Sequence, residues 1–459
     1  MSAASPPVQA VIATNRFGLG ARPGEIKRAS SDPRGFLKAQ VRPQGADQPP
    51  GQYRSAEQML AAFGDYKDAR KKIKKSSSAE DLKQQKRAAF FEMRRGGEWQ
   101  ELLGRDRLAA TTQASFRERW TRFWANHFTV SGRKPAIAFL TGPFEREAIR
   151  PHVFGRFEDM LMASTHHPGM LLFLDQSASI GPGSMVGGRG RRGLNENLAR
   201  EILELHTVGI GAGYSQADVT EFARALTGWS FDNGRDGLPA RPFVFKTAWH
   251  EPGQRTVMGR RYPEGGEEQG GAILKDLAAH PATARHVSTK IARHFTADEP
   301  PPALVDRLEQ TWKKTGGSLD KVALALIDSP EAWEAEPRKF KTPSEFVISS
   351  WRAFGDAPDE PQQVIRPMEA LGQRPLSAPS PKGWPEDAAQ WAAPAEILKR
   401  INLAQTLVTQ APPALEPRAV AAEALGPMQG EKLATALARA ESRPQALAVL
   451  LMSPEFQRR

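Results

Sequence analysis

The chain has 459 residues, of which 40% are hydrophobic and 25% are charged; this is an ordinary globular composition that can bury a sizeable core. It contains no cysteine, which excludes disulfide bonds, thiol catalysis and thiolate metal sites. The formal net charge is +11, and because no run of about 18 apolar residues occurs, we expect no transmembrane span.

The N-terminal residues do not resemble an export signal. Residues 1–18 lack a basic n-region and a proper apolar h-region, so the sequence as written predicts a cytoplasmic protein. A true start codon further upstream would instead allow a periplasmic location. Residues 11–40 then predict a short helix that ends near Gln40, and residues 41–56 form a Pro/Gln-rich linker.

A strongly basic tract follows this linker. Helices are predicted at 56–76 and 79–95, and residues 67–95 contain eleven Lys/Arg against four Asp/Glu. The apolar spacing favours a solvated amphipathic hairpin, whereas the charge would also suit binding to an anionic surface. Few aromatic side chains are placed for stacking on bases, so nucleic acid is the less favoured partner.

Two helical regions, 98–129 and 143–163, come next. The first carries an aromatic stripe with His127 in its middle, at the spacing of one helix face. A single histidine on an apolar face is usually a core residue bonded to a carbonyl or carboxylate, and a functional site is the alternative. Residues 181–193 contain six glycines, which predicts a flexible loop that acts either as a lid or as a surface insertion.

Residues 195–229 are the most informative segment, because local signals in them predict two capped helices. Asn195 is a typical N-cap and Gly209 a typical helix stop. Ser215 and Asp218 form a capping box at the start of the second helix, with Asp in place of the usual Glu.

The first of these two helices has polar residues on both sides. His206 lies in the middle of the apolar stripe and is therefore expected to face the core. On the opposite side Glu196, Arg200 and Glu204 follow one another at i,i+4 spacing, with Glu201 near the edge. This charged face predicts either a solvated surface with weak ion pairs or a buried polar site between helices.

Residues 241–262 differ from their surroundings and predict two strands around a turn at Pro252 and Gly253, with His250 at the turn. A histidine at such a turn is either delivered into a cleft or exposed. The tail, 343–459, is expected to be helical with proline-rich breaks around 356–385. Between the hairpin and the tail, helices are predicted at about 268–279, 281–295, 301–315 and 318–328.

One of these helices, 281–295, carries a basic arc beside its apolar face. The arc consists of His286, Lys290, Arg293 and His294. Such an arc is suited to holding a phosphate, sulfate or carboxylate group, and a solvated helix face is the alternative.

The sequence therefore predicts a mostly α, multi-helical globular fold with one small β-hairpin. The expected organisation is an N-terminal helical lobe at 11–240, the hairpin at 241–262, and a C-terminal helical lobe at 265–459 that is either separate or continuous with the first. The N-terminal lobe includes the basic hairpin, 56–95, and the glycine-rich loop, 181–193.

Six short blocks follow one another along the chain. They read NRFGLGARPGE, RWTRFWANHF, the 195–229 segment, HEPGQRTVMG, HPATARHVSTKIARHF and KGWPEDAAQW. Together they resemble successive blocks of the bacterial domain-of-unknown-function 1800 family over nearly the full length. That family has no assigned activity, so the resemblance implies a fold and candidate positions, His250 among them, and no reaction. Relatives often carry export signals and are encoded beside a second exported family, which implies an exported, envelope-associated partner.

Two functions of different classes remain open. The first is an enzyme with a His/Glu/Arg polar site, for metal-assisted hydrolysis or proton transfer. No cofactor is assigned, and neither HExxH nor another tight ligand spacing supports a metal. The candidate catalytic residues are His206, Glu204, Glu201, Glu196, Arg200, His127 and His250. The second function is a non-catalytic binding or assembly factor for an anionic polymer or an envelope-associated partner, which would use the basic tract and the basic arc.

Overall fold

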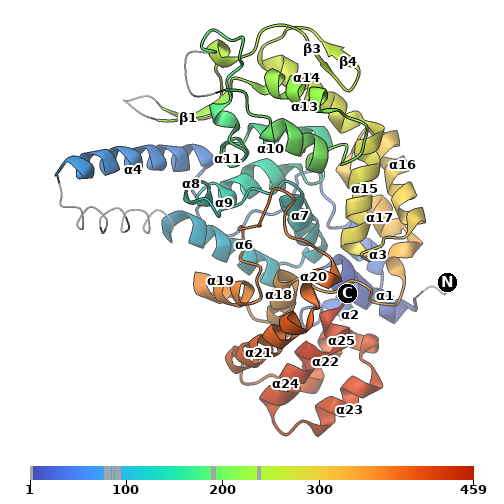
Figure 1. The fold of residues 1–459 in the computed structure, drawn as a ribbon. Helices are drawn as coiled ribbons and strands as arrows, with labels where there is room; N and C mark the ends of the chain where they lie inside the picture. Colours follow the sequence, from blue (N-terminus) through green and yellow to red (C-terminus); the bar gives the residue numbers. More distant parts are fainter. Residues whose placement is uncertain (1–3, 77–83, 85–86, 88–94, 188–192, 235–238) are drawn as a thin grey trace.

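A computed structural model of the protein shows a mostly helical molecule (Figure 1). Two antiparallel sheets of two strands each are the only sheets among the residues it describes, so the predicted fold class is confirmed. No helix in the described part is long and apolar enough to cross a membrane. The structure describes residues 4–76, 84, 87, 95–187, 193–234 and 239–459, without the side chains of 68–76, 95, 96 and 135.

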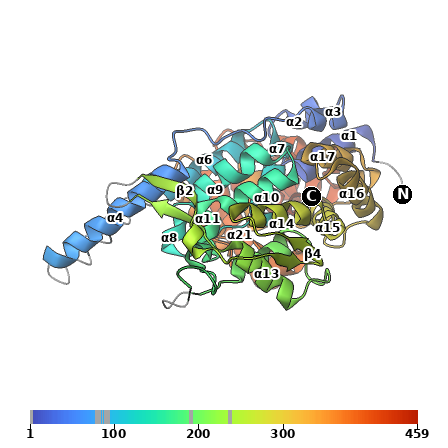
Figure 2. The same cartoon turned by 90° about the horizontal axis from the view of Figure 1, so that it is seen from above.

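The N-terminal part consists of shorter helices and one long arm, α4, which projects from the body and matches the predicted 56–76 helix (Figure 2). The second predicted helix of that hairpin, 79–95, falls almost entirely outside the described residues. The elements are α1 (Pro6–Ile12), the π-helical turn η1 (Ala13–Phe17), α2 (Glu25–Ala29), α3 (Pro33–Lys38), α4 (Ala56–Ser76), η2 (Arg95–Trp99), α6 (Gln100–Thr111), α7 (Ser115–His127), α8 (Pro135–Ala138), α9 (Thr141–Phe144), η3 (Glu145–Ile149), η4 (Arg150–His152), α10 (Phe157–His166), α11 (Pro168–Phe173) and η5 (Gln176–Ala178).

Two of the predicted helical regions are broken. Between α6 and α7, the guanidinium of Arg352 donates hydrogen bonds to the carbonyls of Ala109 (2.8 Å) and Thr112 (3.0 Å), which satisfies the end of α6. The 143–163 region is interrupted at η4, where Pro151 cannot donate a helical hydrogen bond. Periodicity predicted both regions as helical and overlooked these stops.

The 195–229 segment forms the two predicted helices, but the N-cap position of the first is Glu196 rather than the predicted Asn195, whose Oδ1 accepts from the N–H of Asn197 (2.9 Å). The segment forms α12 (Asn197–Glu201), which continues as the π-helical turn η6 (Ile202–His206), and then α13 (Gln216–Leu226). The predicted capping box at the start of α13 is present in both directions. Gly209 follows η6 with a φ of 88°, a conformation that favours glycine, and its N–H donates to the carbonyl of Leu203.

The strands pair differently from the prediction. They are β1 (Trp229–Asn233), β2 (Ala240–Phe245), β3 (Arg255–Val257) and β4 (Arg260–Tyr262), with the short helix η7 (Thr247–Trp249) between β2 and β3. β2 pairs with β1 and β3 pairs with β4, so the predicted pairing across Pro252 and Gly253 is wrong. The β3–β4 turn uses Met258 and Gly259, both with positive φ, as a tight two-residue hairpin requires.

The C-terminal part is helical, and the four helices predicted between 268 and 328 are confirmed to within a residue or two. The predicted proline-rich break is wrong in one place, because α19 begins with Pro361 in its first turn and tolerates Pro367 inside it. The elements are α14 (Glu267–Ala279), α15 (Pro281–Phe295), α16 (Pro302–Thr315), α17 (Leu319–Asp328), η8 (Pro330–Trp333), α18 (Pro343–Phe354), α19 (Pro361–Ala370), α20 (Ala388–Trp391), α21 (Pro394–Gln410), α22 (Pro417–Leu425), η9 (Gly426–Met428), α23 (Glu431–Arg439), α24 (Arg443–Met452) and α25 (Pro454–Gln457).

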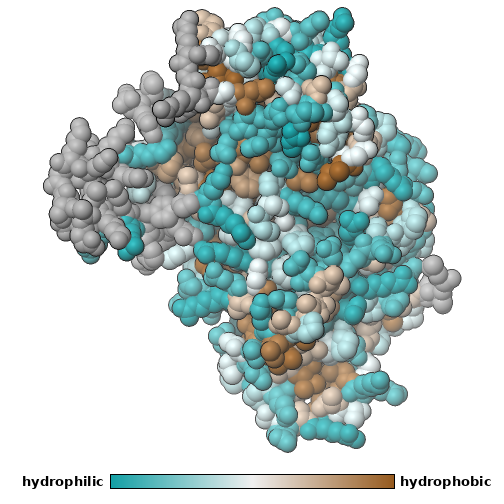
Figure 3. Space-filling view, viewed as in Figure 1, coloured by the Kyte–Doolittle hydropathy of each residue, from teal (hydrophilic) through white to brown (hydrophobic). Residues whose placement is uncertain are grey.

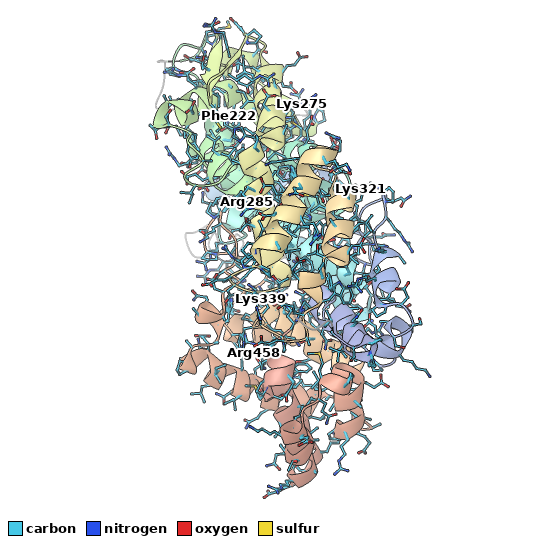
Figure 4. All side chains as sticks on the ribbon, turned by 90° about the vertical axis from the view of Figure 1, so that its right-hand side faces the viewer. Phe222, Lys275, Arg285, Lys321, Lys339 and Arg458 are labelled. Atoms are coloured by element: carbon cyan, nitrogen blue, oxygen red, sulfur yellow. The ribbon has the colours of Figure 1, made fainter. Side chains whose placement is uncertain are left out.

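Three hydrophobic clusters among the described residues hold these helices together. The larger core surrounds α7, whose aromatic stripe is buried as predicted, a smaller one lies among α18, α21 and α24, and the third packs the start of α4 against Phe139 and Leu140. α15 runs along the larger core towards the C-terminal helices (Figure 4). The face of the molecule seen in Figure 3 is mostly hydrophilic with small hydrophobic patches. The polar groups of the candidate site lie on α15 and between α7, α18 and the 373–386 segment.

Candidate functional site

α7 and η6 bring His127 and His206 together. Both are 1% exposed, so the prediction that each faces a core is confirmed. The ring nitrogen Nε2 of His127 lies 3.1 Å from the backbone oxygen of His206, and the two ring centroids are 6.1 Å apart. Because the carbonyl can only accept, His127 carries its proton on Nε2.

These two imidazoles are neutral at physiological pH. Burial lowers the pKa of both rings, to about 3 for His206, and the positive charge of Lys290 lowers each further. With Nε2 of His127 protonated, its Nδ1 is an acceptor, and this buried atom has no hydrogen-bond partner among the described residues. Nε2 of His206 is likewise buried without a partner there.

The charged face of the same helix consists of Glu196, Arg200 and Glu204, which we call the outer row. It lies towards α13 and solvent, with side chains 28–36% exposed. Glu196 and Arg200 are 3.0 Å apart, Arg200 and Glu204 3.8 Å, and Glu196 also accepts from Thr220 and Gln216 on α13. Glu201 beside it is half-buried, and its pKa is raised by burial and by Glu204.

The outer row does not join the histidines. No hydrogen bond or ion pair within the described ranges links Glu196, Arg200 or Glu204 to His127 or His206. The outer row therefore forms weak ion pairs at the surface, which is the first of the two alternatives that the sequence predicts for this charged face.

His250 anchors the loop after β2. Its Nδ1 lies 2.9 Å from the carbonyl of Thr227, and its ring packs edge-on against Phe245, with centroids 5.2 Å apart. The side chain is buried, so the alternative of an exposed turn histidine is excluded. Its contacts are with the strand region, and none in the described part joins it to His127 or His206.

α15 points three of its basic residues inwards. His286, Lys290 and His294, which we call the inner row, are spaced four residues apart and so share one helix face. Nε2 of His286 lies 3.3 Å from the carbonyl of Leu205, beside η6. Arg293 instead lies exposed, where its Nε donates to the backbone oxygen of Asp298. The predicted basic arc is thus divided between the interior and the surface.

A carboxylate from a distant segment meets the end of the inner row. Nδ1 of His294 lies 2.7 Å from Oε1 of Glu386, and both side chains are largely buried. Burial alone would raise the pKa of Glu386, but the charge and the hydrogen bond of His294 lower it to about 2. Glu386 is therefore ionised, and Nδ1 of His294 donates its proton to it.

A small cavity lies beside this pair, between α7, α18 and the irregular segment 373–386. Its volume is about 120 Å³, which leaves room for several water molecules. The segment is held over it by Asn126, whose side chain exchanges two hydrogen bonds with the backbone of Trp384. The polar side chains in its wall include Arg119, Arg122, Asn126, His294, Glu345 and Glu386.

A buried ion cluster forms part of the cavity wall. Glu345 accepts hydrogen bonds from Arg119 and from Arg459, the latter at 2.7 Å. Burial would raise the pKa of Glu345, but the two guanidinium groups hold it well below its usual range. Arg459 also donates to the backbone oxygen of His294 (2.7 Å), so the cluster fixes the position of that histidine.

No group of three or more His, Asp or Glu side chains in the described ranges is arranged to hold a metal ion.

A family model described as a protein of unknown function (DUF1800) matches residues 12–458. The chain belongs to the DUF1800 family. The resemblance of the six sequence blocks is therefore confirmed over nearly the full length. No curated protein and no solved structure matches the chain.

The description of the DUF1800 family names no activity, so the chemistry of this DUF1800 protein has to be inferred from its own residues. Sequence reasoning missed Glu386 and Glu345, which lie 92 and 51 positions after His294. The only sequence signal for Glu386 is its place in the KGWPEDAAQW block, and for Glu345 its helical capping box with Thr342.

Proposed function

We propose that the protein is an enzyme that catalyses proton transfer, with His294 as the general acid or base and Glu386 as the carboxylate that orients it. The observation that carries this proposal is the 2.7 Å contact between Nδ1 of His294 and Oε1 of Glu386 in the wall of the small cavity. A histidine whose second nitrogen is fixed by a carboxylate is a common arrangement in acid–base catalysis.

The protonation pattern of His294 supports this role. Because Nδ1 donates to Glu386, the neutral ring carries its lone pair on Nε2. This Nε2 atom is buried and has no hydrogen-bond partner among the described residues. A buried polar atom without a partner costs stability, and such atoms in native proteins often belong to functional sites.

The cavity wall holds the reacting pair in a rigid frame. Arg119 and Arg122 line it, and each is fixed by a carboxylate, Arg119 by Glu345 and Arg122 by Asp106 at 2.7 Å. The cavity is small, so we infer that it takes only the reacting end of a substrate.

Exchange of substrate hydrogen for solvent deuterium tests the proposal, because an enzyme that removes and returns a proton incorporates deuterium into its substrate. A mixture of compounds is used, so that no single substrate has to be chosen in advance. Pools of small organic acids, ketones and phosphorylated metabolites are incubated with the protein in D₂O, and deuterium incorporation is measured by mass spectrometry. We expect incorporation into at least one compound by the wild type and a loss of about 100-fold or more in Glu386→Gln.

Glu147→Gln is the matched control, because Glu147 also faces a buried histidine, with its Oε2 3.6 Å from Nε2 of His167, away from the cavity. It is expected to behave as wild type. Equal incorporation by wild type and Glu386→Gln, or none by the wild type, would refute the proposal.

A second candidate function rests on the projecting arm α4 (Figure 1), whose sequence runs into the basic tract 67–95. This function is a binding or assembly factor for an anionic polymer or an envelope-associated partner. It predicts heparin binding that weakens steeply with salt and is lost when Lys71, Lys72, Lys74 and Lys75 are changed to Gln. Unchanged binding by that variant would exclude the tract as the binding surface.

A further inference from the structure

Lys290, in the middle of the inner row, differs from the other inward-facing lysines of the C-terminal half. Lys339 has a fully buried side chain that contacts Asp298 at 2.7 Å, and it is labelled between Arg285 and Arg458 in Figure 4. Lys341 is also buried, and its Nζ donates to Ser349 (3.0 Å) and lies over the ring of Phe456. Half-buried Lys290, by contrast, has neither a hydrogen bond nor a carboxylate within 4 Å in the part of the chain that the structure describes.

The groups around Lys290 do not neutralise it. Burial lowers the pKa of His127, His206 and His286, and Lys290 itself lowers each further, so these rings are uncharged. Burial also lowers the pKa of Lys290, to about 8, which still leaves the amine mostly protonated at neutral pH.

The nearby charges leave a positive excess. Arg293 and Lys382 add positive charge, and Glu386 is the one carboxylate in the described residues whose charge acts appreciably on Lys290. That carboxylate is already bonded to His294. A partly desolvated ammonium with no partner is unfavourable, so a ligand that brings negative charge would complete the site.

The neighbouring imidazoles can contribute hydrogen bonds to such a ligand. Nδ1 of His127 and Nε2 of His206 are buried, and neither has a partner among the described side chains and backbone. Because both rings are neutral, a ring nitrogen that carries no proton can accept a hydrogen bond from an acidic O–H group. A singly protonated phosphate monoester provides both the negative charge and that donor, whereas a carboxylate provides the negative charge alone.

We propose that Lys290 is the centre of an oxyanion-binding subsite, flanked by His127, His206 and His286, that holds the carboxylate or phosphate group of the substrate. This inference rests on the proposed function, because Lys290 lies four residues before His294 on the same face of α15, a spacing of about 6 Å along the helix axis. A substrate anchored at Lys290 would therefore place its reacting end towards the His294–Glu386 pair. The substrate class is a small organic acid or phosphorylated metabolite.

Thermal unfolding with inorganic phosphate or acetate as the probe tests this subsite, with sodium chloride at equal ionic strength as the reference. We expect a saturable rise in Tm for the wild type, because a ligand that binds only the folded state stabilises it. Lys290→Met should lose the rise and Lys290→Arg should retain it. A larger rise with phosphate than with acetate assigns a phosphoryl group, and the reverse assigns a carboxylate.

Lys321→Met is the matched control, because Lys321 is exposed, lies on α17 (Figure 4) and pairs with Asp320 at 3.2 Å. It should keep the response of the wild type. Lys290→Met should fold with an unliganded Tm at least as high as wild type, since it removes an unpaired charge. An equal rise in Lys290→Met, or no rise above sodium chloride in the wild type, would overturn the proposal.

The Glu386→Gln variant separates this inference from the proposed function. It should lose deuterium incorporation and still respond to phosphate. A wild type that binds phosphate through Lys290 and exchanges no deuterium would leave the subsite in place and refute the proton-transfer reaction. A wild type that exchanges deuterium but shows no rise in Tm with phosphate or acetate would support the proton-transfer reaction and refute the oxyanion-binding subsite.

Discussion

The outer row and the inner row have the same sequence pattern, three polar residues at intervals of four positions. In the structure the outer row lies at the surface and the inner row faces other elements of the fold. Members of the outer row contact each other and α13, with side chains about one third exposed. The inner row faces η6 and the 373–386 segment and includes an unpaired lysine. Helical spacing thus identifies which residues share a face, and the elements that cover that face decide what the residues do.

The two rows also differ in where their partners come from. The outer row finds its partners within 24 positions along the chain, whereas the partner of His294 lies 92 positions away. Surface pairs of the first kind are weak, while buried pairs of the second kind are costly to break. Four predictions test this contrast between a dispensable and an essential polar row.

The largest effect is expected at the buried cluster that fixes His294. Glu345→Ala leaves Arg119 and Arg459 without their carboxylate, and we expect a loss of about 3–5 kcal/mol in the free energy of unfolding. Urea denaturation measures it. Glu204→Ala, in the outer row, is the control and should cost less than about 1 kcal/mol. Similar losses of unfolding free energy in Glu345→Ala and Glu204→Ala would show that the buried cluster is no more important for stability than the outer row.

A pH effect is expected next. The pKa of His206 is about 3 in the folded state and near 6.5 when unfolded, so the unfolded chain binds the proton first as pH falls. The titration of His206 therefore leaves the free energy of unfolding almost unchanged above pH 6.5. It lowers this free energy progressively as the pH falls from 6.5 towards 3. Between pH 6.5 and 5 this histidine alone should remove about 2 kcal/mol, since one pH unit corresponds to about 1.4 kcal/mol.

Urea denaturation at pH 5 and 6.5 tests this prediction in wild type and in His206→Gln. The variant should show a smaller decline, whereas Glu204→Gln in the outer row should decline as the wild type does. A decline in His206→Gln as large as in wild type would show that another group is responsible.

A smaller effect is expected where η6 meets the inner row. A Cβ atom on Gly209 would lie 2.6 Å from Nδ1 of His286, and the φ of Gly209 is 88°. Gly211 has a similar φ, 81°, with nothing within 4 Å of a Cβ, so Gly211→Ala isolates the backbone cost of about 1–2 kcal/mol. Gly209→Ala should cost more than this control in thermal unfolding. Equal costs would mean that His286 can move aside freely.

The smallest effect is expected in the outer row itself. Glu196→Gln weakens a partly exposed pair with Arg200, so the change in unfolding free energy should stay below about 1 kcal/mol and shrink further in 0.5 M salt. Denaturation at two salt concentrations measures it. A loss of several kcal/mol would place the outer row among the essential groups after all.

The sequence predicted what local signals control. The capping box of Ser215 and Asp218, the stop at Gly209 and the apolar stripes that bury His127 and His206 all act within one or two helical turns, and the structure has each of them. The pairing of the strands was wrong because the Pro252–Gly253 turn competes with the tighter turn at Met258 and Gly259, and propensity alone does not rank the two.

The site itself was only half predictable. Periodicity identified a basic arc on one side of a helix, but nothing in that helix indicates that Glu386 covers its end or that Arg293 is left at the surface. Long-range contacts of this kind depend on how whole helices pack. A single sequence therefore yields the residues on a face without the residues that meet them.

The hydrogen bonds between Asn126 and the backbone of Trp384 limit which segments of two related proteins can be combined in one hybrid chain. They join the end of α7 to the segment that delivers Glu386, while α15 supplies His294 from between them in sequence. Three stretches of chain must therefore be matched for the pair to form. Exchange of the C-terminal part between relatives should give folded hybrids only when α7, α15 and the 373–386 segment come from the same parent.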